Sequence, residues 1–234
     1  MSKRIGINEP IPLEVLEKVF LSFLETKEVD RDYIETLLSE HIGGDNRRNK
    51  AVGYTNVIFT RPKIIHTLLK EWEADRYLNL TNKEKNVLLI QLCSLAYPVF
   101  FDLISVMGGV FKIQPSVNRD VIISRLTSSY GSNRTLYNAV EAILPMLIKA
   151  GYIFRPKTGL YQAEDNIPVK NEFIMDLIVY TGIKLSDSKT ILAEDIPFKN
   201  WMYFFDFQGE HRVKKSELVS IEDGMLGGGY LSVN

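Results

Sequence analysis

The chain has a single cysteine, Cys93, among its 234 residues. One thiol cannot form an intramolecular disulfide, and it cannot supply the thiolate pairs that Cys-based zinc sites need. Both kinds of stabilising framework are therefore excluded, and we predict neither a cofactor nor a metal. A lone cysteine also fits a reducing compartment, so we expect a cytoplasmic protein.

The sequence lacks a long uninterrupted apolar run as well. The longest stretch, residues 95–110, contains Pro98, Asp102 and the pair Gly108-Gly109. It falls short of the roughly 20 apolar residues that cross a bilayer. The first six residues lead into polar sequence and contain no apolar signal core. We therefore expect no membrane segment and interpret the apolar stretch as buried helix.

Neither sign of charge is in excess, because 28 Lys and Arg face 29 Asp and Glu for a net charge of -1. A uniformly basic nucleic-acid binder is thus excluded, and any polyanion contact must come from a local patch. The shares of hydrophobic residues (45%) and charged residues (24%) are those of a globular chain. The length suits one large domain or two small ones.

Charge is nevertheless segregated along the chain. Residues 9–45 carry a net charge of -7, and residues 46–70 carry +6 without any Asp or Glu. Such a run creates a local potential that the whole-chain charge hides. The alternatives are that these cations lie on the solvated faces of two short helices, or that they pair with the preceding acidic helices. The candidate DNA contacts of the segment are Arg47, Arg48, Lys50, Arg61 and Lys63.

Apolar residues at helical spacing predict a helical N-terminal domain over residues 1–112. One helix is expected near residues 13–24, and a second runs from Asp30 to a glycine cap at Gly43-Gly44. A central helix over residues 83–97, capped by Thr81 or Asn82, is apolar nearly all round. The next, over residues 99–107, is expected to stop at Gly108-Gly109.

Residues 113–165 show the most informative order of elements. A short helix over residues 120–126 precedes a polar turn over residues 128–133, and a longer helix then runs from a Ser132 or Asn133 cap to Gly151. Two extended pieces, residues 152–154 and 160–162, flank the basic loop 155–159. This order is typical of a winged helix-turn-helix, whose second helix reads the major groove.

The chemistry of that module assigns roles to the exposed residues. Arg134 can pair with guanine, Asn138 with adenine, and Asn133 or Tyr137 with phosphate. The wing would use Arg155, Lys157 and Thr158 on neighbouring phosphates. The alternative is a plain protein-binding winged helix or an ordinary small α+β core. Pro145, inside the second helix, is also expected to kink it.

Residues 166–234 predict a smaller α+β region. A helix is expected over residues 171–180, and the aromatic stretch 201–207 favours strands and requires burial. The basic group Arg212, Lys214 and Lys215 has acidic neighbours, which favours a solvated turn. Residues 230–234 form either an added strand or a frayed tail. The predicted fold class is therefore mainly α: a helical N-terminal bundle, a winged helix-turn-helix and a smaller α+β C-terminal region.

The order of parts also resembles the BrxA family, the accessory proteins of BREX phage-defence systems. The similarity covers roughly residues 10–155. It lies in the stretch 37–44 that runs into the basic residues 46–50, in the central helical pair over residues 88–102, and in the helix that ends at residues 149–153. The resemblance implies a mostly helical, cytoplasmic DNA-binding protein without catalysis of its own, encoded with a phage-defence operon. The positions that it carries over are Arg47, Arg48, Lys50 and residues 133–150.

Three functional hypotheses follow. The leading one is a non-catalytic protein that binds double-stranded DNA through the winged helix and the basic N-terminal segment. The alternative is an adaptor in a multi-subunit complex, such as a defence complex, which holds protein partners through the aromatic C-terminal third. The third is an enzyme such as a nuclease. No carboxylate pair with a following Lys lies on a recognisable strand, and neither glycine pair continues into a phosphate loop, so we predict no enzyme.

Overall fold

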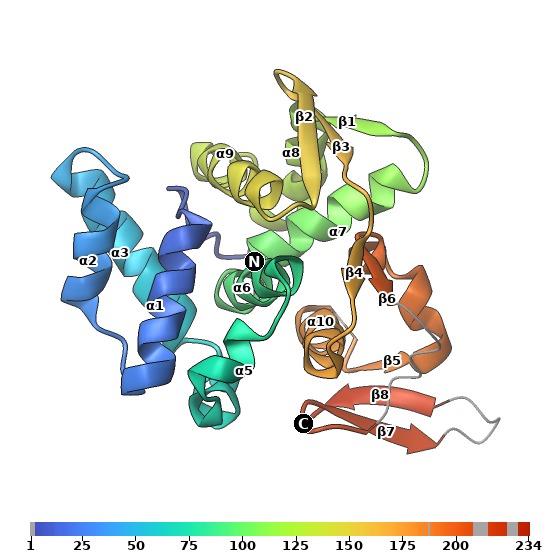
Figure 1. The fold of residues 1–234 in the computed structure, drawn as a ribbon. Helices are drawn as coiled ribbons and strands as arrows, with labels where there is room; N and C mark the ends of the chain where they lie inside the picture. Colours follow the sequence, from blue (N-terminus) through green and yellow to red (C-terminus); the bar gives the residue numbers. More distant parts are fainter. Residues whose placement is uncertain (1–2, 187, 208–214, 224–228) are drawn as a thin grey trace.

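The computed structural model describes residues 3–186, 188–207, 215–223 and 229–234 (Figure 1). Its elements are mostly helical, with small sheets toward the C-terminus, so the prediction of a mainly α fold with an α+β C-terminal region is confirmed. The helices of the N-terminal half are α1 (Leu13–Thr26), α2 (Arg31–Ser39), α3 (Asp45–Thr60), α4 (Lys63–Thr67), η1 (Leu69–Glu71), α5 (Ala74–Leu78), α6 (Asn82–Ala96) and α7 (Val99–Phe111).

The C-terminal half combines helices with three small sheets. Its helices are α8 (Arg119–Tyr130), α9 (Arg134–Lys149), α10 (Glu172–Leu185), η2 (Ala193–Phe198) and η3 (Asn200–Met202). The antiparallel sheet of β1 (Ser116–Asn118), β2 (Ile153–Lys157) and β3 (Leu160–Ala163) has the order β1-β3-β2. The strands β4 (Ile167–Val169) and β6 (Phe205–Phe207) pair in parallel, and the antiparallel third sheet, β5 (Thr190–Leu192), β7 (Val219–Asp223) and β8 (Gly229–Val233), has the order β5-β8-β7.

The second helix ends earlier than its sequence predicts. The Asp30 side chain caps α2 by accepting from the backbone N–H groups of Asp32 and Tyr33, and α2 ends at Ser39. The positive φ of 83° falls at Gly44, which precedes α3 and does not terminate α2. The glycine pair therefore serves the entry of the next helix. The basic segment forms the 16-residue helix α3 followed by the short α4, not two short helices.

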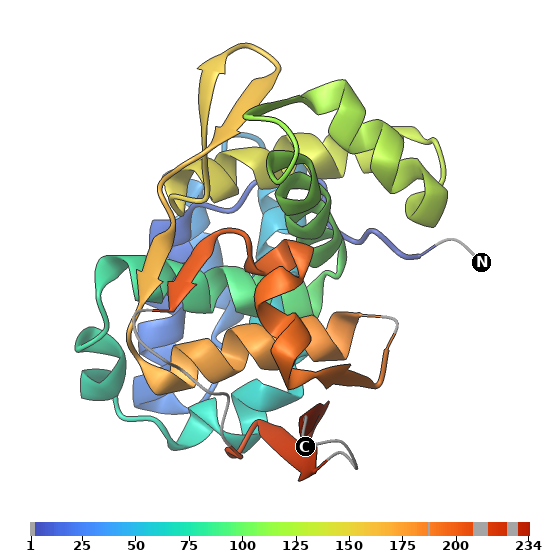
Figure 2. The same cartoon turned by 90° about the vertical axis from the view of Figure 1, so that its right-hand side faces the viewer.

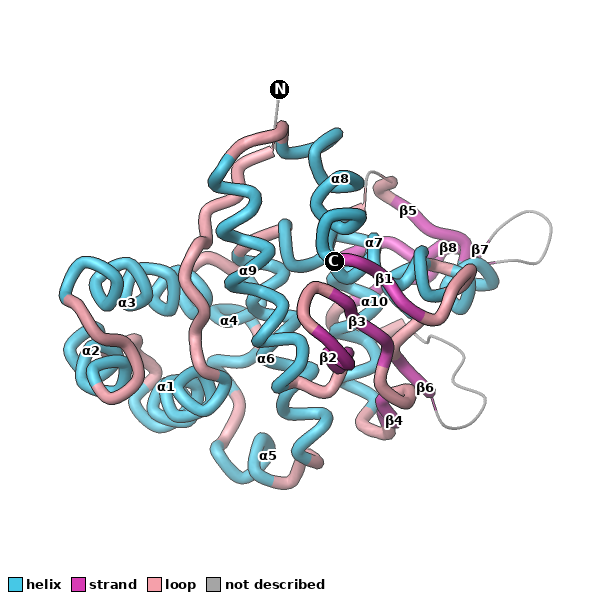
Figure 3. The backbone as a smooth tube through the Cα atoms, turned by 90° about the horizontal axis from the view of Figure 1, so that it is seen from above, coloured by secondary structure: helices cyan, strands magenta, loops and turns pink. Residues whose placement is uncertain are grey.

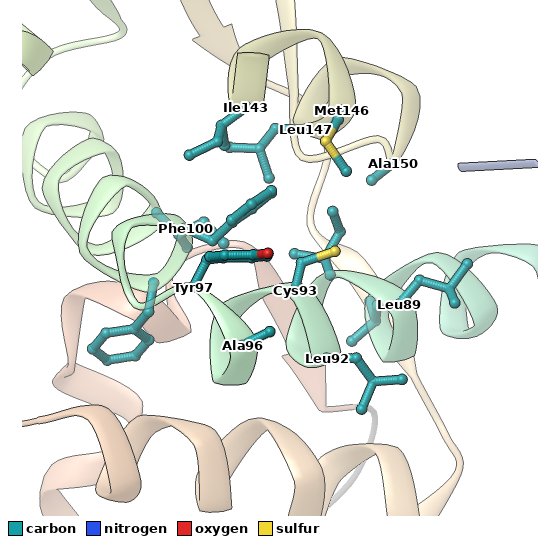
Figure 4. Close-up of a cluster of buried hydrophobic side chains, with 14 of the residues drawn as sticks. Leu89, Leu92, Cys93, Ala96, Tyr97, Phe100, Ile143, Met146, Leu147 and Ala150 are labelled. Atoms are coloured by element: carbon teal, nitrogen blue, oxygen red, sulfur yellow. The ribbon is translucent and has the colours of Figure 1, made fainter. Parts of the chain in front are cut away.

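Helix α6 lies at the centre of the core, as predicted. Thr81 caps it through a capping box with Glu84, and nearly every residue from Val87 to Ala96 is buried. Cys93 lies near the C-terminal end of this helix and Tyr97 directly follows it. Figure 4 shows both residues beneath Leu147 and Met146 of α9. Burial raises the pKa of the Cys93 thiol, so this cysteine is a packing residue.

Helix α7 does not stop at the glycine pair but continues through Gly108-Gly109 to Phe111. The glycines are there for packing. A Cβ on Gly108 would overlap the backbone carbonyl of Asn200 in η3. A Cβ on Gly109 would lie 2.8 Å from the side-chain Nδ2 of Asn200. Bare glycine backbone thus allows η3 to lie directly on α7.

Helix α8 is longer than the predicted residues 120–126, because it includes the Ser128-Ser129-Tyr130 segment that we expected to be a turn. Tyr130 is buried, and its hydroxyl donates to Asp102 Oδ2 of α7 at 2.7 Å. That anchor holds the last turn of α8 in place. The turn shortens to residues 131–133, where Gly131 has a φ of 75°. Helix α9 continues through Pro145 without a break.

Most of the aromatic stretch 201–207 is buried, as predicted, but it is only partly strand. Trp201 and Met202 belong to the 3-10 helix η3, and strand β6 begins at Phe205. The C-terminal tail is a strand, because β8 pairs with both β5 and β7. Helix α10 runs five residues past the predicted end at residue 180. Arg212 and Lys214 lie outside the described residues, and Lys215 is exposed.

Two features join the halves of the chain. The side chain of Glu84 is 4% exposed and reaches from α6 to the start of α10, where it accepts from the backbone N–H groups of Lys170 (3.0 Å) and Asn171 (2.8 Å). The N-terminal segment, residues 3–12, lies between α3 and α9 when seen from above (Figure 3). Figure 2 shows α7, η3 and α10 stacked beneath the hairpin of β2 and β3.

Candidate nucleic-acid interface

The outward face of α9 is polar and open. Its inward face is buried against the core through residues such as Leu136, Ile143 and Leu147, which recur at helical spacing. The residues on the opposite side are exposed: Arg134, Tyr137, Asn138 and Glu141. Tyr137 retains 46% of its surface, an unusual exposure for an aromatic side chain with no polar partner among the described residues. The face therefore presents a cation, an amide and a phenol at one end of a rigid helix.

Asn133 occupies the cap of α9 and is committed to it. Its Oδ1 accepts from the backbone N–H of Leu136 at 3.0 Å, and its Nδ2 donates to the carbonyl of Tyr130 at 3.0 Å. The two predicted roles of this residue, helix cap and phosphate ligand, compete for the same atoms. The geometry favours the cap, which leaves Tyr137 as the available phosphate donor at this end of the helix.

The hairpin of β2 and β3 stands beside α8 and α9 with its cations exposed. Lys157 pairs with Leu160 across the two-residue turn Thr158-Gly159, and Gly159 has a φ of 74°, where a side chain would be strained. Arg155, Lys157 and Thr158 are all exposed. Arg155 also lies against the Tyr161 hydroxyl; burial raises the pKa of Tyr161, and Arg155 partly opposes that shift.

Arg119 links the hairpin to α9, and the sequence did not single it out. Its backbone N–H donates to the carbonyl of Gly159 at 2.9 Å, at the tip of the hairpin. Its guanidinium Nη1 lies 2.7 Å from Glu141 Oε1 on the outward face of α9, and that hydrogen bond raises the pKa of Arg119. The negative charge of Glu141 is thereby paired with the positive charge of Arg119. The signal in the sequence was the basic first residue after a short strand, which is too common to single out.

The structure divides the basic N-terminal segment between the two ends of α3. Arg47 and Arg48 lie in its first turn and Arg61 just past its last, about 21 Å apart at 1.5 Å per residue. That separation exceeds two Debye lengths of about 8 Å each at physiological salt, so the two ends act independently. Lys63, at the start of α4, belongs with Arg61.

Two of the three cations at the start of α3 pair with carboxylates, but only Glu35 of α2 belongs to one of the preceding acidic helices. Arg47 donates to Glu9 Oε2 through Nε (3.1 Å) and Nη2 (2.9 Å), which raises the pKa of Arg47. Arg48 pairs with Asp45 and lies 3.8 Å from Glu35. Lys50 is exposed and has no ion pair with any other described residue. The Arg47 side chain is 62% exposed, so solvent weakens its pair with Glu9 and a phosphate can compete for it.

A groove joins this region to α9. It has a volume of about 320 Å³, and its walls include Pro10, His41, Arg47 and the α9 residues Pro145 and Lys149. Arg47 and Lys149 therefore share one groove although they are far apart in the sequence. Seen from above, α9, the N-terminal segment and the connection from α2 to α3 lie side by side (Figure 3).

Other kinds of site find little support in the described part of the chain. It contains no group of three or more His, Cys, Asp or Glu side chains that could hold a metal ion. No single helix there is long and apolar enough to span a membrane; α6 and α7 pass that test only as a pair, which is bent by 116°. Comparison with protein-family models, with curated proteins and with solved structures finds no match to this chain.

Proposed function

We propose that residues 99–163 form a winged helix-turn-helix that binds double-stranded DNA without catalysis. The observation that carries the proposal is the order helix, strand, helix, helix, hairpin from α7 to β3, closed by the antiparallel sheet order β1-β3-β2. In this arrangement α9 is the recognition helix and the hairpin of β2 and β3 is the wing. The exposed polar face of α9 beside a cationic hairpin is what groove binding requires.

The residues at the start of α9 contact base edges in this proposal. Arg134 is the first residue of the helix, and Asn138 lies one turn further on the same face. A guanidinium matches the two acceptors of guanine, and a side-chain amide matches the acceptor and donor of adenine. Tyr137 donates to phosphate between them.

Phosphate contacts flank the reading helix on both sides. On one side the wing offers Arg155, Lys157 and the hydroxyl of Thr158. On the other side the groove beside α9 offers Arg47 and Lys149, with Lys50 further along α3. A duplex seated on α9 would meet cations at both edges, which orients it without reading sequence. Arg61 lies about 21 Å from Arg47 along α3 and lines a different cavity, so it and Lys63 are not part of this proposed contact.

The setting of the protein remains part of the proposal. A cytoplasmic protein that needs no cofactor agrees with the single buried Cys93. A role as an accessory factor in phage defence, with protein partners in the same complex, rests on the resemblance to the BrxA family. Neither the geometry of α9 nor that of the wing depends on it.

The experiment that tests DNA binding is a mobility shift with a mixed-sequence duplex at low salt. We expect the double variant Arg134→Ala/Lys157→Ala to bind about 10- to 100-fold more weakly than the wild type. The matched control is Lys70→Ala/Lys83→Ala, which removes two exposed cations away from this face and should leave affinity unchanged. Wild-type affinity should also fall linearly on a log–log plot against salt. Equal binding by both double variants, or no binding by the wild type, refutes the proposal.

A second candidate function, a protein adaptor, is favoured by one observation. Two apolar side chains are largely exposed: Phe198 at 76% and Ile113 at 82%. The aromatic stretch that was predicted to hold the partner is instead part of the core, since Trp201, Phe204 and Phe205 are buried. The two exposed residues lie near each other, because Lys112, the residue before Ile113, donates from its Nζ to the carbonyl of Phe198 at 2.6 Å. If this face holds a partner, a protein encoded beside this one should co-purify with it in high salt after nuclease treatment. The double variant Phe198→Ser/Ile113→Ser should lose that partner and retain DNA binding.

A further inference from the structure

A second concave site lies at the bend between α6 and α7. Its volume is about 350 Å³, within the range of small-molecule pockets. Four segments that are distant in the sequence form its walls: the N-terminal segment, the end of α3, the bend itself and the end of α10. Each wall contributes at least one cation or the aromatic ring of the bend, and these residues are Lys3, Arg4, Arg61, Tyr97 and Lys184.

None of the described residues that line this cavity is acidic. The nearest carboxylate that the contacts identify is Asp102, one turn into α7, which pairs with Lys3 at 3.0 Å. Arg4 and Lys184 are exposed, and neither side chain makes a hydrogen bond or an ion pair with another described residue. Like charges gathered in this way repel one another unless an anion lies between them.

Arg61 is partly anchored and partly free. Its Nη1 donates to the carbonyl of Ala96 at 2.8 Å, and its guanidinium carbon lies 5.6 Å from the centre of the Tyr97 ring. Arg4 approaches the same residue: burial raises the pKa of Tyr97, while Arg61 and Arg4 both oppose that shift. Arg4 and Arg61 therefore line the same cavity as this buried ring.

The helix ends around the cavity account for only part of this positive charge. The C-termini of α3, α6 and α10 meet here, each equivalent to roughly half a negative charge, and the N-terminus of α7 supplies roughly half a positive charge. Among the described residues, four cations stand against these helix ends and the carboxylate of Asp102, which leaves a surplus of about two positive charges. A phosphate monoester carries about -1.5 to -2 at neutral pH, which matches this surplus.

We propose that this cavity binds a phosphate group, either inorganic phosphate or the phosphate of a small monoester, held by Arg4, Arg61 and Lys184. Arg61 offers the planar donor fork that fits phosphate oxygens, and Arg4 and Lys184 supply charge from the opposite walls. Lys3 contributes less, because Asp102 already holds its ammonium group. The site uses none of the exposed residues of α9 or the wing.

The test is isothermal titration of the full chain with inorganic phosphate in a phosphate-free buffer at constant ionic strength. The informative variant is Arg4→Gln/Lys184→Gln, because neither side chain holds another described element in place and the fold should survive. We expect saturable binding by the wild type and at least tenfold weaker binding by this variant. The control Lys70→Gln/Lys83→Gln makes the same charge change outside the cavity and should bind as the wild type does.

Absence of saturable binding by the wild type overturns the proposal, as does an equal loss in both double variants, which would indicate diffuse charge attraction. A duplex DNA titration then separates the two sources of phosphate. If Arg4→Gln/Lys184→Gln leaves DNA affinity unchanged, the site takes a free phosphate or monoester. The other outcome is that the variant weakens DNA binding and makes the slope of log affinity against log salt shallower by about 0.9 or more, the effect of at least one lost phosphate contact. The bound phosphate then belongs to the DNA backbone.

Discussion

The indole of Trp201 lies directly on the backbone of Gly182, so that a Cβ at Gly182 would overlap its ring. The same 3-10 helix, η3, rests on Gly108 and Gly109 of α7 through Asn200. Helices α7 and α10 thus both carry bare backbone where η3 inserts between them. This contact fixes the C-terminal region to the helical core, and it makes the glycines far less replaceable than their helical positions suggest.

We expect Gly182→Ala to destabilise the protein by about 1–3 kcal/mol, because the new methyl group overpacks the Trp201 contact. The control is Gly53→Ala in α3, where an added Cβ meets nothing within 4 Å. There the substitution should stabilise the protein by about 0.5–1 kcal/mol, since alanine is the better helix former. Urea denaturation of both variants measures the difference, and stabilisation by both substitutions would show that Trp201 does not restrict this position.

Glu84 should make stability depend on pH in the acidic range. Burial alone would raise its pKa, but hydrogen bonds from Asn171, Thr81 and Lys170 outweigh that effect and lower it below the ordinary value of 4.5. A carboxyl whose folded pKa is depressed stabilises the fold above its unfolded pKa and loses that contribution as pH falls through the folded pKa. The wild type should therefore lose stability progressively below about pH 4.5.

Glu84→Gln tests this assignment. The amide nitrogen of Gln must face one of the backbone N–H groups that now donate to the carboxylate, so we expect a loss of about 2–3 kcal/mol at pH 7. The two proteins should converge in stability as the pH falls, whereas Glu25→Gln, at an exposed position of α1, should follow the wild type. A constant difference between Glu84→Gln and the wild type from pH 7 down to pH 3 would contradict the assignment.

Glu9 should restrain DNA binding through Arg47. Its carboxylate side chain is 14% exposed and holds the Arg47 guanidinium beside the groove that adjoins α9. If the duplex passes over this groove, Glu9→Gln should tighten DNA binding by about two- to fivefold at low salt. The slope of log affinity against log salt should also steepen by up to about 0.9, the effect of one added phosphate contact. Mobility shifts across a salt series measure both quantities.

The control for Glu9→Gln is Glu25→Gln, which makes the same charge change at the far end of α1. An equal gain in both variants would indicate a response to net charge alone. No gain in either would remove Arg47 from the interface and confine the contact to α9 and the wing.

Local sequence signals determined much of this protein. The apolar spacing of α1, α6 and α9 followed from short-range preferences, as did a cap at Thr81 or Asn82, a cap at Ser132 or Asn133 and a hairpin loop within residues 155–159. The structure selects Thr81 and Asn133 and shortens the loop to Thr158-Gly159. These features depend on residues within one or two turns of each other, and α9 and the hairpin of β2 and β3 are built largely of them. The order of elements on which the proposed DNA binding rests could therefore be predicted from the sequence.

Tertiary packing decided the rest. Gly108-Gly109 reads as a helix end, yet α7 continues because η3, some 90 residues later, requires bare backbone there. The polar Ser128-Ser129 pair reads as a turn, yet it is helical because Tyr130 is anchored on Asp102. The basic segment reads as one patch, but α3 places its charges about 21 Å apart, and the Arg61 end instead joins Arg4 and Lys184. Charge along a chain is additive, whereas the potential at a site depends on which segments the fold brings together.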